Sequence, residues 1–321
     1  MIEFLEAENT TAYRLFHGVC EGLPGTTVDR YGDVILIQTF REELLTQQEL
    51  VDVSCLFPEE TRILYNPRGG HARRQAKAGE LNFGDFSDRS TETVFQEVGL
   101  NFEFSCLPFS DPSLFLDFRF ARRWIQNNAS DLSVLNTFAY TCGCGVAAAV
   151  GGARKVVNLD HGSRCLELGA KNAALNNVSM QNVQSDFYPA MRQYAGLGVK
   201  GLRAARRGVK YPSLNPETFD LIILDPPTLT KSKWGAVDIV NDYSALAKPA
   251  LLSLSENGRL LATNHTSQVS MDEWVDVISR CAKKCGRPIK KVESISQQEC
   301  SDNDFPSFDD RPPLKVAVFT V

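Results

Sequence analysis

The residues best suited to chemistry form a short segment in which an apolar run, residues 219–224, is followed at once by Asp225-Pro226-Pro227. Both prolines have a fixed φ and neither can donate a hydrogen bond, so the turn that they build is stiff. Such a turn would hold its carbonyl groups and the Asp225 carboxylate in fixed positions beside a flat ring. Two prolines could also simply end a strand, but the residues described next favour a chemical role.

A second group of candidate residues surrounds a glycine-containing loop. The apolar run at residues 133–138 leads into Gly143-Cys-Gly145 and a small-residue helix expected at residues 146–150. Glycine is needed where a ligand lies against bare backbone, and a helix N-terminus offers free N–H groups. The segment predicts a cofactor site formed by Asn136, Phe138, Tyr140, Gly143 and Gly145.

Two acidic residues follow the next two strands. Asp160 ends the strand expected at residues 155–159, and Asp186 comes just before Phe187. A carboxylate about twenty residues past a glycine turn is placed to accept hydrogen bonds from ribose hydroxyls. Asp186 could accept from the exocyclic amine of adenine, with Phe187 packing on the ring. A helix N-cap explains either acid alone, but the ordered set favours a nucleotide cofactor.

Strands and helices alternate from about residue 131 onwards. Helices are expected at residues 164–176 and 243–254, and further strands at 258–263 and 316–321. This order predicts an α/β fold with a doubly wound, Rossmann-like parallel sheet and right-handed crossovers. Ligands then bind at the carboxyl ends of the strands, near the point where the strand order reverses.

The first part of the chain predicts a small α+β domain. Residues 34–40 alternate as a strand, and residues 41–56 have helical spacing. The polar segment at residues 84–93 suggests a boundary, after which residues 94–104 alternate as one strand. We therefore expect domains at 1–92 and 93–321.

Composition and charge limit the class of protein. The chain has 321 residues, nine cysteines and a formal net charge of −5. No stretch approaches the ~18 apolar residues that span a bilayer, and acids stand where a signal peptide carries basic residues. We expect a cytoplasmic protein with reduced thiols, no metal site and no membrane partner. The sequence is compatible with a homodimer.

Two basic segments without acids, at residues 62–79 and 187–216, stand out in this acidic chain. The net charge argues against nonspecific coating of nucleic acid, but not against an enzyme with a local basic patch. Each segment alone is explained as a solvated loop, whereas two of them favour contact with a polyanion. The residues expected to contact the polyanion are Arg68, Arg73, Arg74, Arg203, Arg206 and Arg207, together with Lys231 and Lys233 from the segment after the Asp-Pro-Pro turn.

Over almost its whole length the chain resembles the bacterial large-subunit (23S) ribosomal RNA methyltransferases of the RlmI and RlmK/L kind. The motifs that carry the resemblance lie at residues 21–25 (EGLPG), 28–33 (VDRYGD), 115–119 (FLDFR), 135–141 (LNTFAYT) and 225–233 (DPPTLTKSK). The resemblance implies a class I methyltransferase domain that uses S-adenosyl-L-methionine to methylate an RNA base.

The resemblance also implies roles for single residues. Asp160 would hold the ribose and Asp186 the adenine of the cofactor. Asp117 and Arg119 lie in the segment that enters the catalytic domain and would border the cofactor. The target base would be held by Asp225, Pro226 and Pro227.

Three departures from the family pattern limit the substrate. The RNA-binding PUA domain of some members is not expected here, and Cys142-Gly143 stands where two glycines are usual. Residues 262–267 (ATNHTS) lack the cysteine that the cytosine-C5 members carry. Cytosine C5 becomes nucleophilic only after a thiolate adds to the ring, so 5-methylcytosine is disfavoured. A guanine nitrogen, N7 or N2, needs no such nucleophile, and Asn264 could hydrogen-bond to the base edge.

The favoured hypothesis is therefore a methyltransferase for a base nitrogen of large-subunit rRNA or its precursor. A protein or small-molecule substrate is an alternative, against which the basic segments argue. A cofactor-binding RNA assembly factor without activity is another, because the PUA domain is not expected and the Cys142 loop is altered. A nicotinamide oxidoreductase is disfavoured because the third glycine of its fingerprint is absent at the expected spacing.

Overall fold

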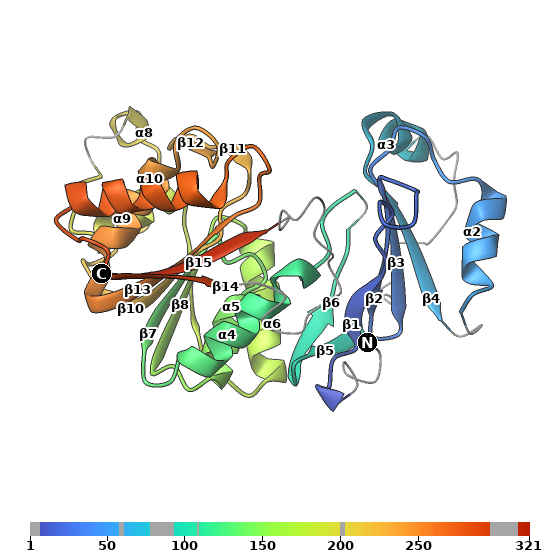
Figure 1. Cartoon of the computed structure of the whole chain (residues 1–321), viewed down its shortest axis with the longest axis horizontal. Coiled ribbons are helices and arrows are strands. Elements are labelled where there is room, and N and C mark those ends of the chain that lie inside the picture. The colour runs from blue at the N-terminus through green and yellow to red at the C-terminus, as the bar shows by residue number, and fades with distance from the viewer. Residues whose placement is uncertain (1–6, 58–60, 78–92, 108, 200–202, 296–313) are drawn as a thin grey trace. The chain divides into compact units, whose positions relative to one another are not determined.

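The computed structural model describes residues 7–57, 61–77, 93–107, 109–199, 203–295 and 314–321 (Figure 1). These residues fall into two units, the first reaching Arg119 and the second starting at Phe120. The segment 93–119 thus groups with the first unit, whereas the boundary expected from the sequence follows residue 92. Most of the polar segment behind that expectation, residues 84–92, lies outside the described residues.

The first unit is built on a four-stranded sheet in the order β1-β2-β3-β4. Strands β1, β2 and β3 pair antiparallel, and β3 pairs parallel with β4. Apolar residues of the sheet pack with Leu50 of the helix between β3 and β4. The elements are β1 (Ala12–Phe16), β2 (Thr26–Tyr31), β3 (Val34–Thr39), α2 (Gln47–Ser54), β4 (Arg62–Pro67) and α3 (Gly70–Lys77).

Strands β5 (Thr93–Glu97) and β6 (Leu100–Phe104) form a hairpin, so the prediction of one strand over residues 94–104 is wrong. Val98 and Gly99 turn the chain with φ values of 52° and 75°, a left-handed pair that suits a tight hairpin. The rings of Phe95 and Phe104 lie 5.2 and 4.9 Å from that of Tyr31. This aromatic contact is why the hairpin groups with the first unit.

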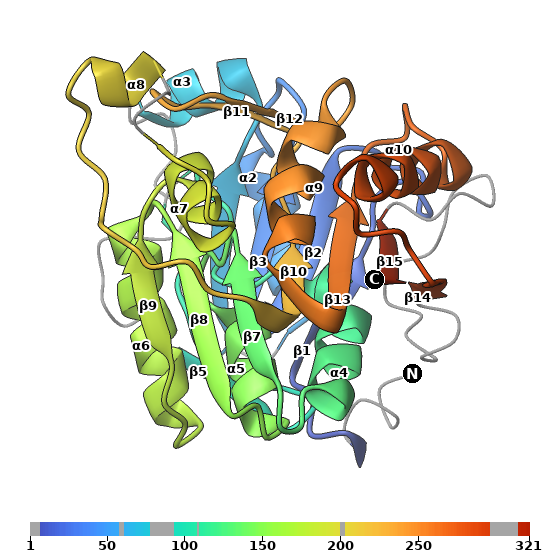
Figure 2. The ribbon, with the colours of Figure 1, turned by 90° about the vertical axis from the view of Figure 1, so that its left-hand side faces the viewer.

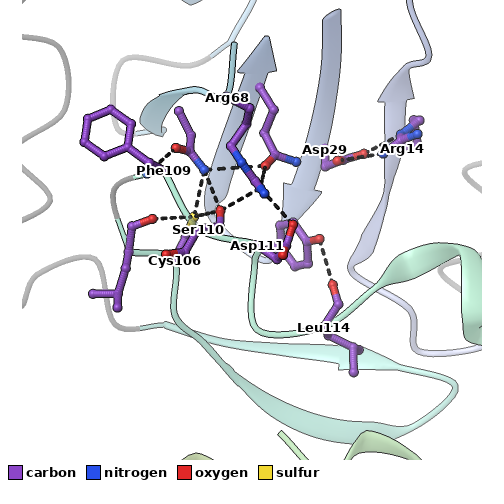
Figure 3. A network of polar contacts seen from close by, with 12 residues as sticks. Arg14, Asp29, Arg68, Cys106, Phe109, Ser110, Asp111 and Leu114 are labelled. Carbon is purple, nitrogen blue, oxygen red and sulfur yellow. Dashed lines mark hydrogen bonds and ion pairs between the residues drawn. The ribbon is translucent and has the colours of Figure 1, made fainter. Parts of the chain in front are cut away.

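A polar network fixes the segment after β6 to β4 (Figure 3). The Asn66 side-chain amide donates a hydrogen bond of 2.8 Å to the backbone oxygen of Ser110. The Arg68 guanidinium donates to the same oxygen at 2.9 Å and pairs with Asp111 at 2.8 Å. Burial raises the pKa of the neighbouring Cys106 thiol to about 12, so this thiol stays protonated.

The second unit carries a seven-stranded sheet in the order β14-β15-β13-β10-β7-β8-β9. Strands β13, β10, β7, β8 and β9 are parallel, which confirms the predicted doubly wound sheet. The final strand, β15, is antiparallel to both neighbours, a detail that the sequence pattern did not predict. The bounds are β7 (Ser133–Thr137), β8 (Lys155–Asp160), β9 (Gln181–Gln184), β10 (Phe219–Leu224), β13 (Leu254–Asn264), β14 (Lys291–Ile295) and β15 (Lys315–Thr320).

Helices cover both faces of this sheet (Figure 2). The helices on one face are α4 (Arg119–Asn128), α5 (Gly143–Val150) and α6 (Ser163–Leu175). Those on the other face, where the main apolar core lies, are α7 (Phe187–Tyr194), α9 (Tyr243–Leu252) and α10 (Met271–Lys284). None of the described helices is long and apolar enough to cross a bilayer.

Three short elements lie beyond the carboxyl ends of the parallel strands (Figure 2). They are α8 (Arg203–Arg206) and the two strands of a hairpin, β11 (Leu229–Lys231) and β12 (Ala236–Asp238). The hairpin is inserted between the Asp-Pro-Pro turn and α9, so it belongs to the same edge of the sheet as the candidate residues.

Candidate functional site

The candidate site lies where β7 and β10 are neighbours in the sheet of the second unit. Thr137, the last residue of β7, pairs with Leu224, the last residue of β10, and Leu224 pairs with Ala262 of β13. The strand order reverses between β7 and β10, the place where α/β sheets bind ligands. The glycine-containing loop follows Thr137, and the Asp-Pro-Pro turn follows Leu224. The two therefore begin next to each other at the carboxyl edge of the sheet.

The loop after β7 has an uncommon backbone conformation. Phe138, Tyr140 and Cys142 have φ values of 53°, 48° and 64°, in the left-handed region. Non-glycine residues persist there only where their surroundings impose it, and such residues gather at ligand sites. The Tyr140 N–H donates to Oδ2 of Asp160 at 2.9 Å, and the Gly162 N–H donates to Oδ1 at 2.8 Å. Asp160 thus joins this loop to the start of α6.

Cys142 occupies the left-handed position just before α5. The family that the sequence resembles usually has glycine at this position. Its side chain packs against α6 so closely that a Cβ at Gly169 would lie 2.3 Å from its sulfur. Burial, with the nearby Asp160 carboxylate as a smaller cause, raises the pKa of the Cys142 thiol. The thiol is therefore a protonated packing group.

The Asp225 carboxylate is held in place by two buried side chains. The Thr263 hydroxyl donates to Oδ1 of Asp225 at 2.5 Å, and the Tyr243 hydroxyl donates to the backbone oxygen of Thr263 at 2.8 Å. Burial, and next the Asp225 charge, raises the pKa of Tyr243 well above its usual value, so Tyr243 stays a neutral donor. Asp225 is half-buried, Pro226 is buried and Pro227 is exposed, so the turn presents its outer proline to solvent.

Comparison with known proteins identifies the chemistry of this edge. Residues 70–320 match the family model of S-adenosylmethionine-dependent methyltransferases. The chain belongs to this family. Its cofactor is S-adenosyl-L-methionine.

Individual relatives support the same family. The chain is 27% identical over 303 residues to ribosomal RNA large subunit methyltransferase I of Aeromonas salmonicida, covering 91% of this chain and 70% of the relative. It is 31% identical over 279 residues to ribosomal RNA large subunit methyltransferase K/L of Pseudoalteromonas translucida, covering 84% of this chain and 36% of the relative. The crystal structure of the methyltransferase SMU.776 complexed with SAH has a TM-score of 0.76 and 23% identity, covering 100% of this chain and 78% of that chain. This last likeness shows the shared fold.

The methyltransferase's residues at this edge suit the cofactor chemically. The Asp160 side chain is 11% exposed, and each of its oxygens accepts one backbone N–H, which leaves lone pairs for the hydroxyls of a ribose. Gly143 begins α5, whose first turn offers backbone N–H groups that the helix itself does not use.

Two predicted cofactor residues have packing roles in the methyltransferase. Asn136, Asn158 and Asn182 lie in register on three neighbouring strands, and their amides form hydrogen bonds of 2.9 and 3.0 Å in series. A Cβ at Gly145 would lie 2.1 Å from the Asn158 amide oxygen, so glycine lets α5 pack on this ladder. Asn136 and Gly145 thus position the cofactor loop; direct contact with the cofactor remains a prediction for both.

The aromatic pair beside Asp186 differs from the expectation. Phe187 is 5% exposed and stacks on Phe138, with ring centroids 4.8 Å apart and an angle of 16°. Phe187 supports Phe138, and only the half-buried Phe138 retains ring surface for a ligand. Asp186 is the N-cap of α7, since its Oδ1 accepts the Tyr188 N–H at 3.0 Å, while Oδ2 bonds to no described residue.

Two substitutions separate the capping role of Asp186 from its predicted role at the adenine. Asp186→Asn retains a good N-cap, whereas Asp186→Ala should cost about 1 kcal/mol of stability. If Asp186 accepts a hydrogen bond from the adenine amine, Asp186→Ala removes that bond and should weaken cofactor binding about tenfold. Thermal unfolding and calorimetric titration with S-adenosylmethionine measure the two effects. A destabilised alanine variant with unchanged cofactor affinity would leave Asp186 as a cap alone.

Asn264 positions the loop after β13, and the direct base contact expected from the sequence stays a prediction. It is fully buried, its amide donates to the backbone oxygen of Ile239 at 3.2 Å, and its oxygen accepts the Thr266 N–H at 3.1 Å. Both ends of the side chain are therefore engaged. Next to it, the His265 ring lies 2.5 Å from the Thr228 hydroxyl and links the loop after β13 to the Asp-Pro-Pro turn.

Sequence reasoning did not find Thr263, although a hydroxyl residue at the end of the strand beside β10 is a usable signal. Thr263→Val removes only the hydroxyl, and we expect kcat of the methyltransferase to fall about tenfold as the Asp225 carboxylate loses its donor. The KM for S-adenosylmethionine should not change. Thr263→Ser should restore kcat, and failure of this rescue would make the loss a packing effect.

Asp117 and Arg119 belong to the first unit. Asp117 is half-buried in a short 3-10 helix, Leu116–Phe118. Arg119 is fully buried, donates to the backbone oxygen of Ala12 and lies 3.6 Å from Glu97. Their place beside the cofactor stays a prediction.

The cations predicted to contact RNA differ in how they are engaged. Arg68 is held by Asp111 and Ser110 within the first unit, and its contact with RNA stays a prediction. Arg73 is exposed and lies over the ring of Phe109, with 5.6 Å between the guanidinium carbon and the ring centroid, and Arg74 is exposed. The second unit contributes four exposed cations that form no ion pair with a described residue: Arg206, Arg207, Lys231 and Lys233. Arg203 begins α8, and its side chain lies outside what the structure describes.

Proposed function

We propose that this methyltransferase modifies a base of large-subunit ribosomal RNA or its precursor, and that the acceptor atom is a guanine nitrogen, N7 or N2. The observation that carries this proposal is the pairing of Thr137 with Leu224. It puts the cofactor loop and the Asp-Pro-Pro turn on adjacent strand ends, within reach of one donor and one flat acceptor. Both relatives described above are named as methyltransferases of large-subunit rRNA, which supports the substrate class.

The acceptor atom follows from which nucleophiles the site offers. S-adenosylmethionine would supply an electrophilic methyl group that the lone pair of a base nitrogen attacks, with S-adenosylhomocysteine as the leaving group. An N2 acceptor then loses one proton, whereas an N7 acceptor becomes cationic. The protein then contributes positioning and electrostatic complementarity, through Asp225 and the rigid prolines. Methylation of cytosine C5 would need a thiolate. Residues 262–267 contain no cysteine, and the Cys142 thiol is buried and protonated.

The unpaired cations of the second unit support a polyanionic substrate. Arg206 and Arg207 follow α7 in the chain, and Lys231 and Lys233 follow the Asp-Pro-Pro turn. Their elements lie at the carboxyl edge of the sheet, beside the candidate site (Figure 2). A small-molecule substrate would give these charges no common partner, and a protein substrate would have to present an acidic segment to them.

The test is methyl transfer from labelled S-adenosylmethionine to large-subunit rRNA and its precursor, isolated from cells that lack the protein. Digestion and nucleoside mass spectrometry should then find the label in a methylated guanosine. Label in 5-methylcytidine would contradict the proposed atom, and label in ribosomal protein would contradict the substrate class. Cofactor binding without any transfer would favour an assembly factor without activity.

A further inference from the structure

We propose that the β11–β12 hairpin and residues 206–211 form one surface that binds single-stranded RNA next to the target base, with Trp234 stacking on a neighbouring base. This inference rests on the proposed function, since it takes the substrate to be RNA. It adds the conformation of the substrate and the residue that holds it.

The hairpin is firmly held to the body of the second unit. The Tyr188 hydroxyl of α7 donates to the backbone oxygen of Ala236 at 2.5 Å. A Cβ at Gly235 would lie 2.9 Å from the Tyr188 ring, so the tip rests directly on this ring. Within the tip, the Ser232 N–H donates to the oxygen of Gly235 at 2.9 Å. The tip residues therefore have fixed positions, which a binding surface requires.

An aromatic contact joins the hairpin to the segment after α8. The rings of Tyr211 and Trp234 lie 5.3 Å apart at an angle of 87°, an edge-to-face pair. Both side chains are half-buried, so part of each ring stays open to solvent. The pair brings together two segments that lie far apart in the sequence, and α8 and the hairpin lie close together in Figures 1 and 2.

The joined surface is positively charged. Within the hairpin, the Asp238 carboxylate of β12 accepts hydrogen bonds from the backbone N–H groups of Val240 and Asn241, which partly compensate its charge. The cations of the surface are exposed and form no ion pair with any residue that the structure describes. They are Arg206, Arg207, Lys210, Lys231 and Lys233.

Single-stranded RNA fits this combination better than a duplex does. Enzymes that modify a base act on an unpaired or extruded base, because the reacting atom must reach the active site. Bases beside such a site are unstacked, and aromatic side chains flanked by cations hold them. A duplex would offer the cations its phosphates but no free base face for Trp234.

The fluorescence of Trp234 gives a direct test. The described tryptophans are Trp124, Trp234 and Trp274, and Trp274 is only 1% exposed. In the Trp124→Phe protein, a short unstructured RNA should quench the fluorescence, and the same strand annealed to its complement should quench it much less. Equal quenching by the duplex would contradict the single-strand inference. Equal quenching by polyglutamate would point to an acidic protein partner and would also contradict it.

Activity provides the second measurement. Trp234→Ala should raise the KM for rRNA about 5- to 150-fold, the effect of losing one base–aromatic stack, with the KM for S-adenosylmethionine unchanged. Trp234→Phe should retain most of the affinity. Val292→Ala removes a 40% exposed apolar side chain from β14, at the far edge of the sheet, and serves as the matched control.

The outcomes separate this inference from the proposed function. Wild-type protein that methylates rRNA, with a Trp234→Ala variant of unchanged KM and no quenching by RNA, would refute the surface alone. Wild-type protein that methylates no RNA, but whose Trp234 is quenched by single strands, would refute the proposed function and retain the surface.

Discussion

Asp225→Ala is expected to lower kcat for methyl transfer by about two to three orders of magnitude, the usual loss when a preorganised polar group is removed from an active site. Asp225 directly follows β10, next to the strand that leads to the cofactor loop. Its carboxylate orientation is fixed by the Thr263 hydroxyl. Asp160 ends β8, and the loop that leads into α5 follows β7, so the change at the end of β10 touches neither. S-adenosylmethionine should therefore bind the variant with unchanged affinity. Single-turnover kinetics and calorimetry measure the two quantities.

The control for this variant must exclude a folding defect. Removing the carboxylate leaves the buried Thr263 hydroxyl without its acceptor, at a cost of about 1–3 kcal/mol of stability. Asp225→Asn keeps an acceptor for that hydroxyl and should fold normally while remaining slow. Asp272→Ala removes an exposed carboxylate from α10 and should leave transfer unchanged. Normal transfer by the Asp225→Ala protein would remove its catalytic assignment.

The sequence predicted the strands that position the site because each is short, almost fully buried and rich in Val, Leu or Ile. The strand expected at residues 219–224 agrees with β10 at both ends. Adjacency of the cofactor loop and the Asp-Pro-Pro turn followed from the order of strands and helices alone. Such features depend on local pattern and chain topology, which a single sequence contains.

Features that depend on partners far along the chain were not predictable. Strand β4 lies inside a basic segment, and nothing local shows that Arg68 is held by Asp111, or that Asn66 is buried against Ser110. The stacking of Phe187 on Phe138 likewise joins the first turn of α7 to the loop after β7, which only the folded sheet brings together. Residue types therefore predicted which side chains gather at the edge, and the fold decided which of them are already engaged.

Asp160→Ala is expected to have the largest effect on cofactor binding. Two charge-assisted hydrogen bonds to ribose hydroxyls, at about 1.5–3 kcal/mol each, correspond to a loss of about 10²–10⁴-fold in affinity for S-adenosylmethionine. Calorimetric titration measures it, with Asp272→Ala, which removes an exposed carboxylate from α10, as the control. A variant that binds with wild-type affinity would remove Asp160 from the site.

The two roles of Asp160 can be separated because they act in different states of the protein. Its hydrogen bonds to the Tyr140 and Gly162 N–H groups exist without any ligand, so their loss should lower the melting temperature of the cofactor-free protein. Contact with the ribose should appear only in the additional stabilisation that S-adenosylmethionine gives, which grows with ligand concentration over Kd. Asp160→Asn keeps one acceptor oxygen, so it should recover part of each effect. If the alanine variant melted earlier but gained as much from the cofactor as the wild type, the carboxylate would act on the loop alone, and the ribose would need another partner at the end of β8.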